Sequence, residues 1–213
     1  MFRLSVIADR GIFVSDELWL DALDRVAAAI GSSDEVSLQV RVKGLAPAER
    51  LRLIGLAAER LGTRLGRVIL NGTPEEAKAY GFGGAHLPEA GIPIRSSAPD
   101  SGFVGASIHS IEALQRAVAA HVDYVQFGPV FDAGSKPAAG VGIQAMAAVV
   151  AASPVPVVAV GGITPENLPT CLRAGAVAVA VVTGVLRSPN PGAAISAYLA
   201  AVHAAATTTP VRV

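Results

Sequence analysis

The sequence has few of the residues that mark several protein classes. It holds one cysteine in 213 residues, so no disulfide can form within the chain. Cys171 lies in a stretch with helical periodicity, which favours a small buried thiol over a nucleophile and predicts a reducing, cytoplasmic environment. Charged residues make up 16%, and 17 basic residues balance 17 acidic ones. We therefore expect no nucleic acid partner.

The sequence also lacks a signal or membrane-spanning pattern. The N-terminal run "MFRLSVIADRG" reaches an acidic residue at position 9, before a signal peptide's apolar region would be complete. Every apolar run is too short or too interrupted to span a bilayer, so no membrane partner is expected. The 52% of hydrophobic residues must then fill a core, and the length predicts a single domain over residues 1–213.

Short apolar runs rich in β-branched residues alternate with longer segments of helical period. The runs are too uniformly apolar to be half-solvated, which favours a parallel sheet covered by helices. Eight such units in this length predict an α/β fold, a single (β/α)8 TIM barrel, with a doubly wound open sheet as the alternative. The predicted strands cover residues 3–9, 35–42, 67–72, 84–88, 102–109, 123–129, 155–162 and 176–184.

Helix starts carry Ser or Thr before a first turn that is acidic or begins with Pro, as at Thr73, Ser110 and Thr164. Between the fourth and fifth strands the helix is missing or reduced to the turn-rich segment 89–101. The predicted helices cover residues 16–30, 46–62, 73–81, 110–122, 142–153, 164–175 and 191–206.

Glycines end the last two predicted strands, Gly161 and Gly162 after the seventh and Gly184, behind Thr183, after the eighth. Phosphate commonly binds at these two loops of a TIM barrel. Glycines let backbone N–H groups approach an anion closely. The alternative is that the glycines only terminate strands, but their presence at both expected positions favours phosphate binding.

Strand two carries an unexpected polar face. In "LQVRVKG", Gln39, Arg41 and Lys43 fall at alternate positions, so they share one face while Val40 and Val42 share the other. If the valines contact the helices, the three polar residues point inward and toward the barrel mouth, where they would bind an anionic substrate. The alternative is an edge strand with a solvated face, which a closed barrel does not have.

Further polar residues lie where other strands end. Asn71 ends strand three, His86 ends strand four, and Ser107 and His109 end strand five. Both histidines are candidate acid–base groups because imidazole titrates near neutrality, with a structural, hydrogen-bonded role as the alternative for each. Lys136 lies in the long, glycine-containing loop after strand six and is either a phosphate-binding residue of a lid or a solvated surface lysine.

These segments resemble one known family. "LQVRVKG", "ASIHS", "DYVQFGPVFDAGSKPAAGVG", "VVAVGGIT" and "AVVTGV" are similar, in this order, to motifs of thiamine phosphate synthases and of the related TenI-type thiazole tautomerases. The resemblance covers nearly the whole chain. It implies a phosphate-binding barrel whose partner is a small phosphorylated thiazole-like ligand.

By this resemblance, Gln39, Arg41 and Lys43 would hold a pyrimidine methyl diphosphate in a synthase. The reaction would ionise it to a carbocation and pyrophosphate, and the nitrogen of a thiazole phosphate would capture the cation. Asn71, Ser107, Ser135 and Lys136 would complete the diphosphate site, and backbone groups of Gly162, Val182 and Thr183 would hold the thiazole phosphate.

Departures from the synthase pattern affect the predicted metal site. Synthases carry a magnesium-binding aspartate after the asparagine, where this chain has Gly72, and a second one after strand four, where only Glu89 lies nearby. We therefore expect no metal ligands and no cofactor, with magnesium required only if the chain is a synthase. The "HLP" segment at positions 86–88 is similar to the TenI branch, which moves a proton without metal.

The expected function is therefore a TenI-like, metal-independent thiazole tautomerase. Some TenI proteins use a histidine after the strand-six glycine, where this chain has Pro129, so His86 or His109 would have to act instead. A thiamine phosphate synthase is the first alternative, and a non-catalytic binder of thiazole or thiamine phosphate is the second. Members of the family are often oligomeric, which leaves a homo-oligomer open.

Overall fold

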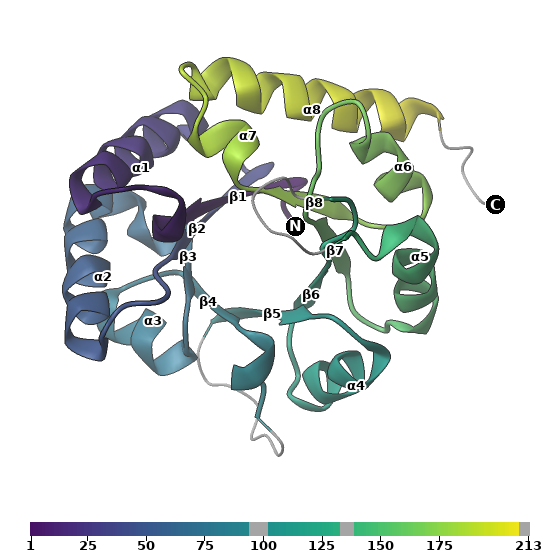
Figure 1. The fold of residues 1–213 in the computed structure, drawn as a ribbon, viewed down its shortest axis with the longest axis horizontal. Coiled ribbons are helices and arrows are strands. Elements are labelled where there is room, and N and C mark those ends of the chain that lie inside the picture. The colour runs from purple at the N-terminus through teal and green to yellow at the C-terminus, as the bar shows by residue number, and fades with distance from the viewer. Residues whose placement is uncertain (94–101, 133–138, 209–213) are drawn as a thin grey trace.

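The computed structural model describes residues 1–93, 102–132 and 139–208. Eight parallel strands form a closed barrel in which each strand pairs with the next and β8 pairs with β1 (Figure 1). The predicted TIM barrel is thus confirmed, and the open sheet is excluded. The strands are β1 (Leu4–Asp9), β2 (Val36–Arg41), β3 (Val68–Asn71), β4 (Gly84–Leu87), β5 (Phe103–Ile108), β6 (Tyr124–Phe127), β7 (Val157–Val160) and β8 (Ala178–Val181).

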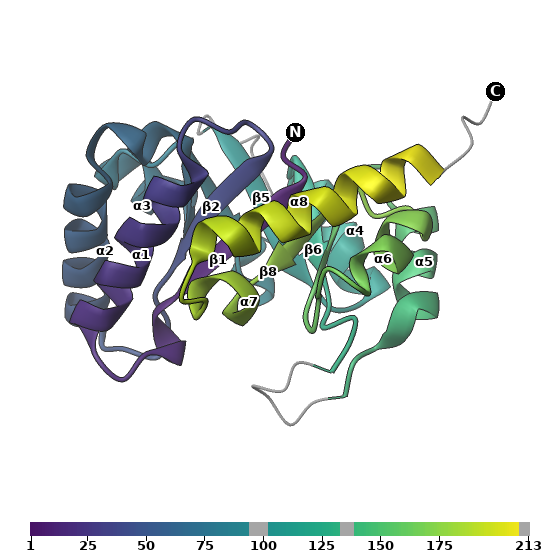
Figure 2. The same ribbon diagram turned by 90° about the horizontal axis from the view of Figure 1, so that it is seen from above.

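Helices surround the barrel, and α8 packs against α1, α6 and α7 (Figure 2). The described residues between β4 and β5 hold only a short 3-10 helix, η3 (Glu89–Gly91), as the turn-rich sequence predicts. No helix of the described residues is both long and apolar enough to cross a membrane. The helices are α1 (Asp16–Ile30), α2 (Pro47–Leu61), α3 (Pro74–Tyr80), α4 (Ile111–Ala119), α5 (Gly142–Ala152), α6 (Leu168–Arg173), α7 (Thr183–Leu186) and α8 (Pro191–Thr208), with η1 (Arg10–Ile12) and η2 (Gly62–Arg67) as further 3-10 helices.

Side-chain caps explain where several helices begin. Thr73 forms a capping box with Glu76 at the start of α3, and Ser110 accepts a hydrogen bond from Ala113 N at the start of α4. The predicted start at Thr164 is wrong, because α6 begins at Leu168. The Asn167 side chain accepts a hydrogen bond from Thr164 N, which holds the preceding residues in a turn.

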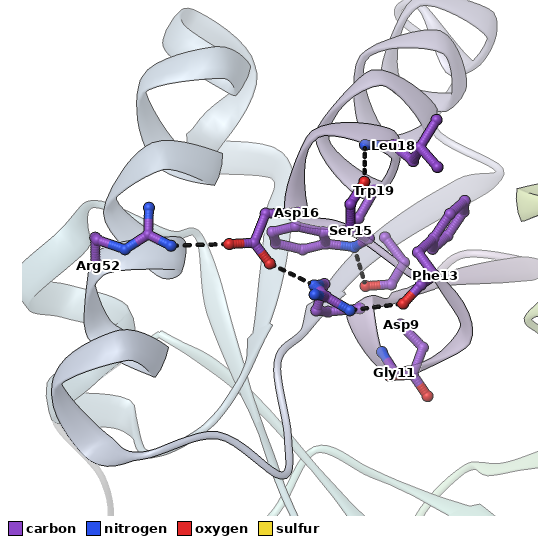
Figure 3. A network of polar contacts seen from close by, with 10 residues as sticks. Asp9, Gly11, Phe13, Ser15, Asp16, Leu18, Trp19 and Arg52 are labelled. Atoms are coloured by element: carbon purple, nitrogen blue, oxygen red, sulfur yellow. Dashed lines mark hydrogen bonds and ion pairs between the residues drawn. The ribbon is translucent and has the colours of Figure 1, made fainter.

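A polar network fixes the loop between β1 and α1 (Figure 3). Asp16 accepts hydrogen bonds from Arg10 Nε at 2.7 Å and from Arg52 Nη2 of α2 at 2.8 Å. The Arg10 hydrogen bond is the main reason that the pKa of Asp16 is lowered. The buried Trp19 indole donates to Ala8 O at 3.1 Å and ties α1 directly to β1. These contacts hold the carboxyl end of β1 against the first two helices.

The alternation of side chains along the strands creates two cores. The outer core lies between the sheet and the helices and contains Val40, Val42 and Trp19. The inner core lies inside the barrel and consists of Phe2, Ile7, Ile69, Tyr124, Val158, Ala178 and Ala180. Polar residues are also buried, and the strand alternation and register place them on this inward face: Ser5, Ser37, Gln39, Asn71, His86 and Gln126.

Tyr124 organises the inner core. Its ring stacks on Phe103 with centroids 5.1 Å apart and meets Phe2 edge-on at 5.5 Å. The ring passes directly over Gly105 of the neighbouring strand, where an added Cβ would lie 2.1 Å from Tyr124 Cζ. Glycine at position 105 is therefore required for this tyrosine to cross the barrel.

We expect Gly105→Ala to lower the free energy of unfolding by about 2–3 kcal/mol, because the new methyl group must displace a fully buried ring. Gly66→Ala is the matched control, since a Cβ there would meet no atom within 4 Å, and it should change stability by less than about 0.5 kcal/mol. Urea unfolding of the two variants measures the difference. Equal stabilities would contradict the packing described here.

Candidate functional site

The polar face of β2 points into the barrel. Gln39 pairs in register with Ile69 of the inner core, whereas Val40 and Val42 belong to the outer core. Arg41 lies on the same face as Gln39, at the carboxyl end of the strand, and exposed Lys43 follows just beyond it. The alternative of a solvated edge strand therefore does not hold.

Arg41 is paired within the protein. Its guanidinium forms an ion pair and hydrogen bond with Asp9, the last residue of β1 and its partner in register. Asp9 also accepts a hydrogen bond from Gly11 N at 3.0 Å. The sequence analysis missed Asp9, although its place at a strand end was a usable signal. Because Asp9 offsets part of the charge of Arg41, the mouth is less positive than the sequence of β2 alone indicates.

His86 lies below the mouth, contrary to the expectation that it ends a strand at the open site. It is 0% exposed, with Nδ1 3.0 Å from the Tyr124 hydroxyl and Nε2 2.9 Å from Ser107 Oγ. Burial, with smaller contributions from the positive charges of Lys43 and Arg41, lowers the pKa of His86 to about 3. A neutral imidazole with both nitrogens engaged is unsuited to acid–base catalysis. The buried position of His86 therefore favours a structural, hydrogen-bonded role.

His109 has the geometry that His86 lacks. It is exposed, one residue beyond β5, and its Nδ1 hydrogen-bonds to the Gly128 carbonyl oxygen after β6. A carbonyl can only accept, so Nδ1 carries a proton, and in the neutral imidazole Nε2 holds the lone pair. Nε2 has no hydrogen-bond partner in the described part of the chain. His109 is therefore the better candidate acid–base group of the two.

The loops after β7 and β8 lie side by side because these strands pair, with Val160 opposite Ala180. Gly161 and Gly162 have φ values of 97° and 63°, which residues other than glycine rarely adopt. A Cβ at Gly162 would lie 2.7 Å from Asp132 O, so the loop after β6 packs closely on this turn. The backbone N–H of Gly162 donates to no acceptor among the described residues, which leaves it able to bind an anion.

The loop after β8 continues as α7, a short helix that the sequence analysis missed. Val182 is its N-cap, and the N–H groups of Thr183 and Gly184 donate to no described acceptor. A Cβ at Gly184 would lie 2.3 Å from the Tyr198 hydroxyl of α8. That hydroxyl donates to Ile163 O at 3.0 Å. Tyr198, also missed from the sequence, therefore connects the two glycine loops from behind.

The position after Asn71 offers no carboxylate and no room for one. Asn71 is buried at the end of β3, and Gly72 follows without a carboxylate. The space beside Gly72 is filled by the Arg50–Glu76 ion pair, because a Cβ there would lie 2.5 Å from Glu76 Oε2 and 2.9 Å from Arg50 Nη2. No group of three or more His, Cys, Asp or Glu residues suited to a metal occurs within residues 1–93, 102–132 and 139–208.

The remaining residues named from the sequence differ in their surroundings. Ser107 is half-buried and hydrogen-bonded to His86, so it belongs to the polar layer beneath the mouth. Glu89, the carboxylate nearest the end of β4, pairs with Arg116 of α4 at 3.3 Å. Ser135 and Lys136 lie outside the described residues.

The sequence also matches known proteins. A sequence model described as thiamine monophosphate synthase matches residues 7–185, most of the chain. The chain belongs to the thiamine monophosphate synthase family. It is 38% identical over 170 residues to a thiamine-phosphate synthase from Methanoculleus marisnigri, covering 77% of this chain and 79% of that protein. It is 36% identical over 186 residues to a thiamine-phosphate synthase from Acidothermus cellulolyticus, covering 84% and 87%.

A solved structure has a similar fold. Thiamine phosphate pyrophosphorylase from Pyrococcus furiosus superposes with a TM-score of 0.73 over 96% of both chains, at 23% identity. At this identity the likeness supports the barrel fold rather than a particular activity.

The buried His86 makes stability depend on pH. Its pKa of about 3 in the folded chain lies below the ordinary unfolded value of about 6.5. Protonation therefore favours the unfolded state, so stability present above about pH 6.5 is lost as the pH falls toward 3. We expect this group alone to remove about 2 kcal/mol of unfolding free energy between pH 7 and 5.

The measurement is chemical unfolding at both pH values for the wild type and His86→Gln. The variant should not show the loss of unfolding free energy between pH 7 and 5 that is due to His86, whatever its stability at pH 7. His121→Asn is the control, because His121 is exposed at a φ of 54° that asparagine tolerates. An unchanged pH slope in His86→Gln would contradict the assignment.

Removing the Tyr198 hydroxyl should loosen the loop after β7. We expect Tyr198→Phe to lower stability by about 1 kcal/mol and to weaken binding of inorganic phosphate, because the hydrogen bond to Ile163 O is lost. Tyr80→Phe is the control, since Tyr80 is half-buried and its hydroxyl has no hydrogen bond among the described residues. Thermal melting and calorimetric titration with phosphate measure the two effects. An unchanged affinity for phosphate in Tyr198→Phe would mean that the hydrogen bond to Ile163 O does not influence phosphate binding.

Proposed function

We propose that this protein is a thiamine phosphate synthase, which joins a pyrimidine methyl diphosphate to a thiazole phosphate and releases pyrophosphate. The observation that carries the proposal is the inward, cationic face of β2, which shares the barrel mouth with the glycine loops after β7 and β8. Two phosphorylated substrates require two such anion-binding regions. The curated relatives named above carry this activity in their names, which adds support.

Each region would serve one substrate. Arg41 and Lys43 would hold the diphosphate and stabilise its charge as the bond to the pyrimidine methyl carbon breaks, with the electron pair leaving on pyrophosphate. Asn71, Ser107, Ser135 and Lys136 remain proposed members of this region. Backbone groups of Gly161, Gly162, Val182, Thr183 and Gly184 would hold the thiazole phosphate, whose ring nitrogen then forms the new bond to the carbon.

The chain's own residues do not offer the carboxylates of a protein-bound magnesium site. Gly72 is packed against the Arg50–Glu76 pair, and Glu89 is paired with Arg116. In this proposal the leaving charge is stabilised by the side chains of Arg41 and Lys43, and Asn71 adds a hydrogen-bond donor.

A TenI-like tautomerase, favoured by the sequence analysis, becomes the second candidate. One observation favours it, namely that His109 lies at the mouth with the lone pair on Nε2. The relatives named as synthases weigh against it, as does Pro129 at the position where some TenI proteins carry a histidine. A binder without turnover would be indicated if neither reaction occurs.

The synthase proposal predicts the effect of a substitution at Lys43. We expect the wild type to form thiamine phosphate from both substrates, and Lys43→Gln to raise KM for the diphosphate by about 10- to 100-fold, since one charged hydrogen bond is lost. Lys78→Gln, an exposed lysine on α3, is the matched control. Chromatography of thiamine phosphate measures the product.

The contrasting variant is His109→Asn. A synthase should keep its activity in this variant, whereas a tautomerase should lose proton exchange on the thiazole carboxylate phosphate. A wild type that forms no thiamine phosphate at saturating substrate and magnesium would overturn the synthase proposal.

A further inference from the structure

The carboxylate of Asp9 is held from two directions at the end of β1. Its side chain lies on the inward face, because Ile7 belongs to the inner core and Ala8 to the outer core. Oδ1 accepts a hydrogen bond from Gly11 N at 3.0 Å, and Oδ2 accepts one from Arg41 Nη1. The bond to Gly11 caps η1 and is local to the chain. Asp9 therefore has a fixed position that does not depend on Arg41.

The chain on both sides of Asp9 is fixed as well. The residue before it, Ala8, accepts a hydrogen bond from the Trp19 indole at 3.1 Å. The residue after it, Arg10, donates to Phe13 O at 2.7 Å. A carboxylate held this firmly can fix the direction of the guanidinium that pairs with it.

The pair between Arg41 and Asp9 uses only one nitrogen of the guanidinium. Nη1 donates to Asp9, whereas Nε and Nη2 donate to no acceptor within residues 1–93, 102–132 and 139–208. The N–H groups of Nε and Nη2 on one edge are parallel and match two oxygens of a phosphate group. The Arg41 side chain is 23% exposed at the mouth. The pair thus leaves the phosphate-binding edge of Arg41 accessible.

Asp9 has two opposite effects on an anion bound at the mouth. Its negative charge repels the anion and weakens binding of a diphosphate. Its contact with Arg41 removes rotamers that a long side chain at a strand end would otherwise sample, so the guanidinium is already directed before charge develops on the leaving group. The second effect matters most in the transition state, when the electron pair passes to the leaving pyrophosphate.

We propose that Asp9 is a positioning residue, which holds the Nε–Nη2 edge of Arg41 in place for the diphosphate while the bond to the pyrimidine methyl carbon breaks. No proton is transferred in this step, and Asp9 acts only through Arg41. The inference rests on the proposed function. It predicts that loss of the Asp9 charge lowers kcat without raising KM, because ground-state binding loses a repulsion while the transition state loses a directed donor.

The test is Asp9→Asn in steady-state assays of thiamine phosphate formation that vary the diphosphate. We expect kcat to fall by about 10- to 100-fold. KM for the diphosphate should fall or stay within about twofold of the wild-type value. Asp16→Asn is the matched control, because Asp16 pairs with Arg10 and Arg52 in the same part of the chain. This variant should lower the melting temperature but keep kcat within about twofold.

A double-mutant cycle tests whether Asp9 acts through Arg41. In the Arg41→Gln background, adding Asp9→Asn should change the single-turnover rate by less than about twofold, because no guanidinium remains to be positioned. An equal fall in both backgrounds would overturn the inference, as would an unchanged kcat or a raised KM in Asp9→Asn alone. If Asp9→Asn does not fold, Asp9→Ser keeps an acceptor for Gly11 N and replaces it in the same assays.

Failure of the proposed function can be distinguished from failure of this inference. If the wild type forms no thiamine phosphate, the synthase proposal fails, and NMR relaxation of the Arg41 Nε–H group in the free protein then tests Asp9 alone. The signal is identified by its absence in Arg41→Gln. We expect the order parameter of a rigid group, about 0.85, in the wild type and that of a flexible group, below about 0.6, in Asp9→Asn. Equal order parameters in the two proteins overturn the inference.

Discussion

Closure of the parallel sheet through the pairing of β1 with β8 is the constraint on which the site depends. In a closed barrel every strand has one face inside and one against the helices, so the polar face of β2 cannot be solvated as an edge. The same closure brings the carboxyl ends of all strands to one mouth. It also sets the turn after β7 beside α7, where backbone amides from both can act on one anion.

The inside of the barrel is divided between apolar and polar layers. Tyr124 packs on Phe2 and Phe103, and its hydroxyl meets His86 at the boundary between the two layers. Burial keeps His86 neutral, so it can join Tyr124 and Ser107 without adding charge beneath the cationic residues of β2. At this depth a positive charge would repel Arg41 and Lys43, and a negative charge would attract them away from a substrate.

Ion pairs within the protein limit the charge at the mouth. Asp9 pairs with Arg41, and Glu76 pairs with Arg50 beside Gly72. Arg50 also donates to the carbonyl oxygens of Val42 and Asn71, both at 3.3 Å, and so connects the ends of β2 and β3. The position next to Asn71 is thus occupied by a structural ion pair rather than by a metal carboxylate. This site therefore depends more on rigid strand ends and on backbone N–H groups held in fixed directions than on its net charge.

The sequence by itself determined the barrel, because eight apolar runs with helical segments between them have few alternative arrangements, and it determined which face of β2 is polar, because strand alternation is local. Only the tertiary structure decided that His86 is buried, that Asp9 pairs with Arg41 and Tyr198 with Ile163, and that Glu76 fills the space beside Gly72. These facts depend on contacts between residues far apart in the chain. Strand register and helix packing set such contacts, and no local pattern records them.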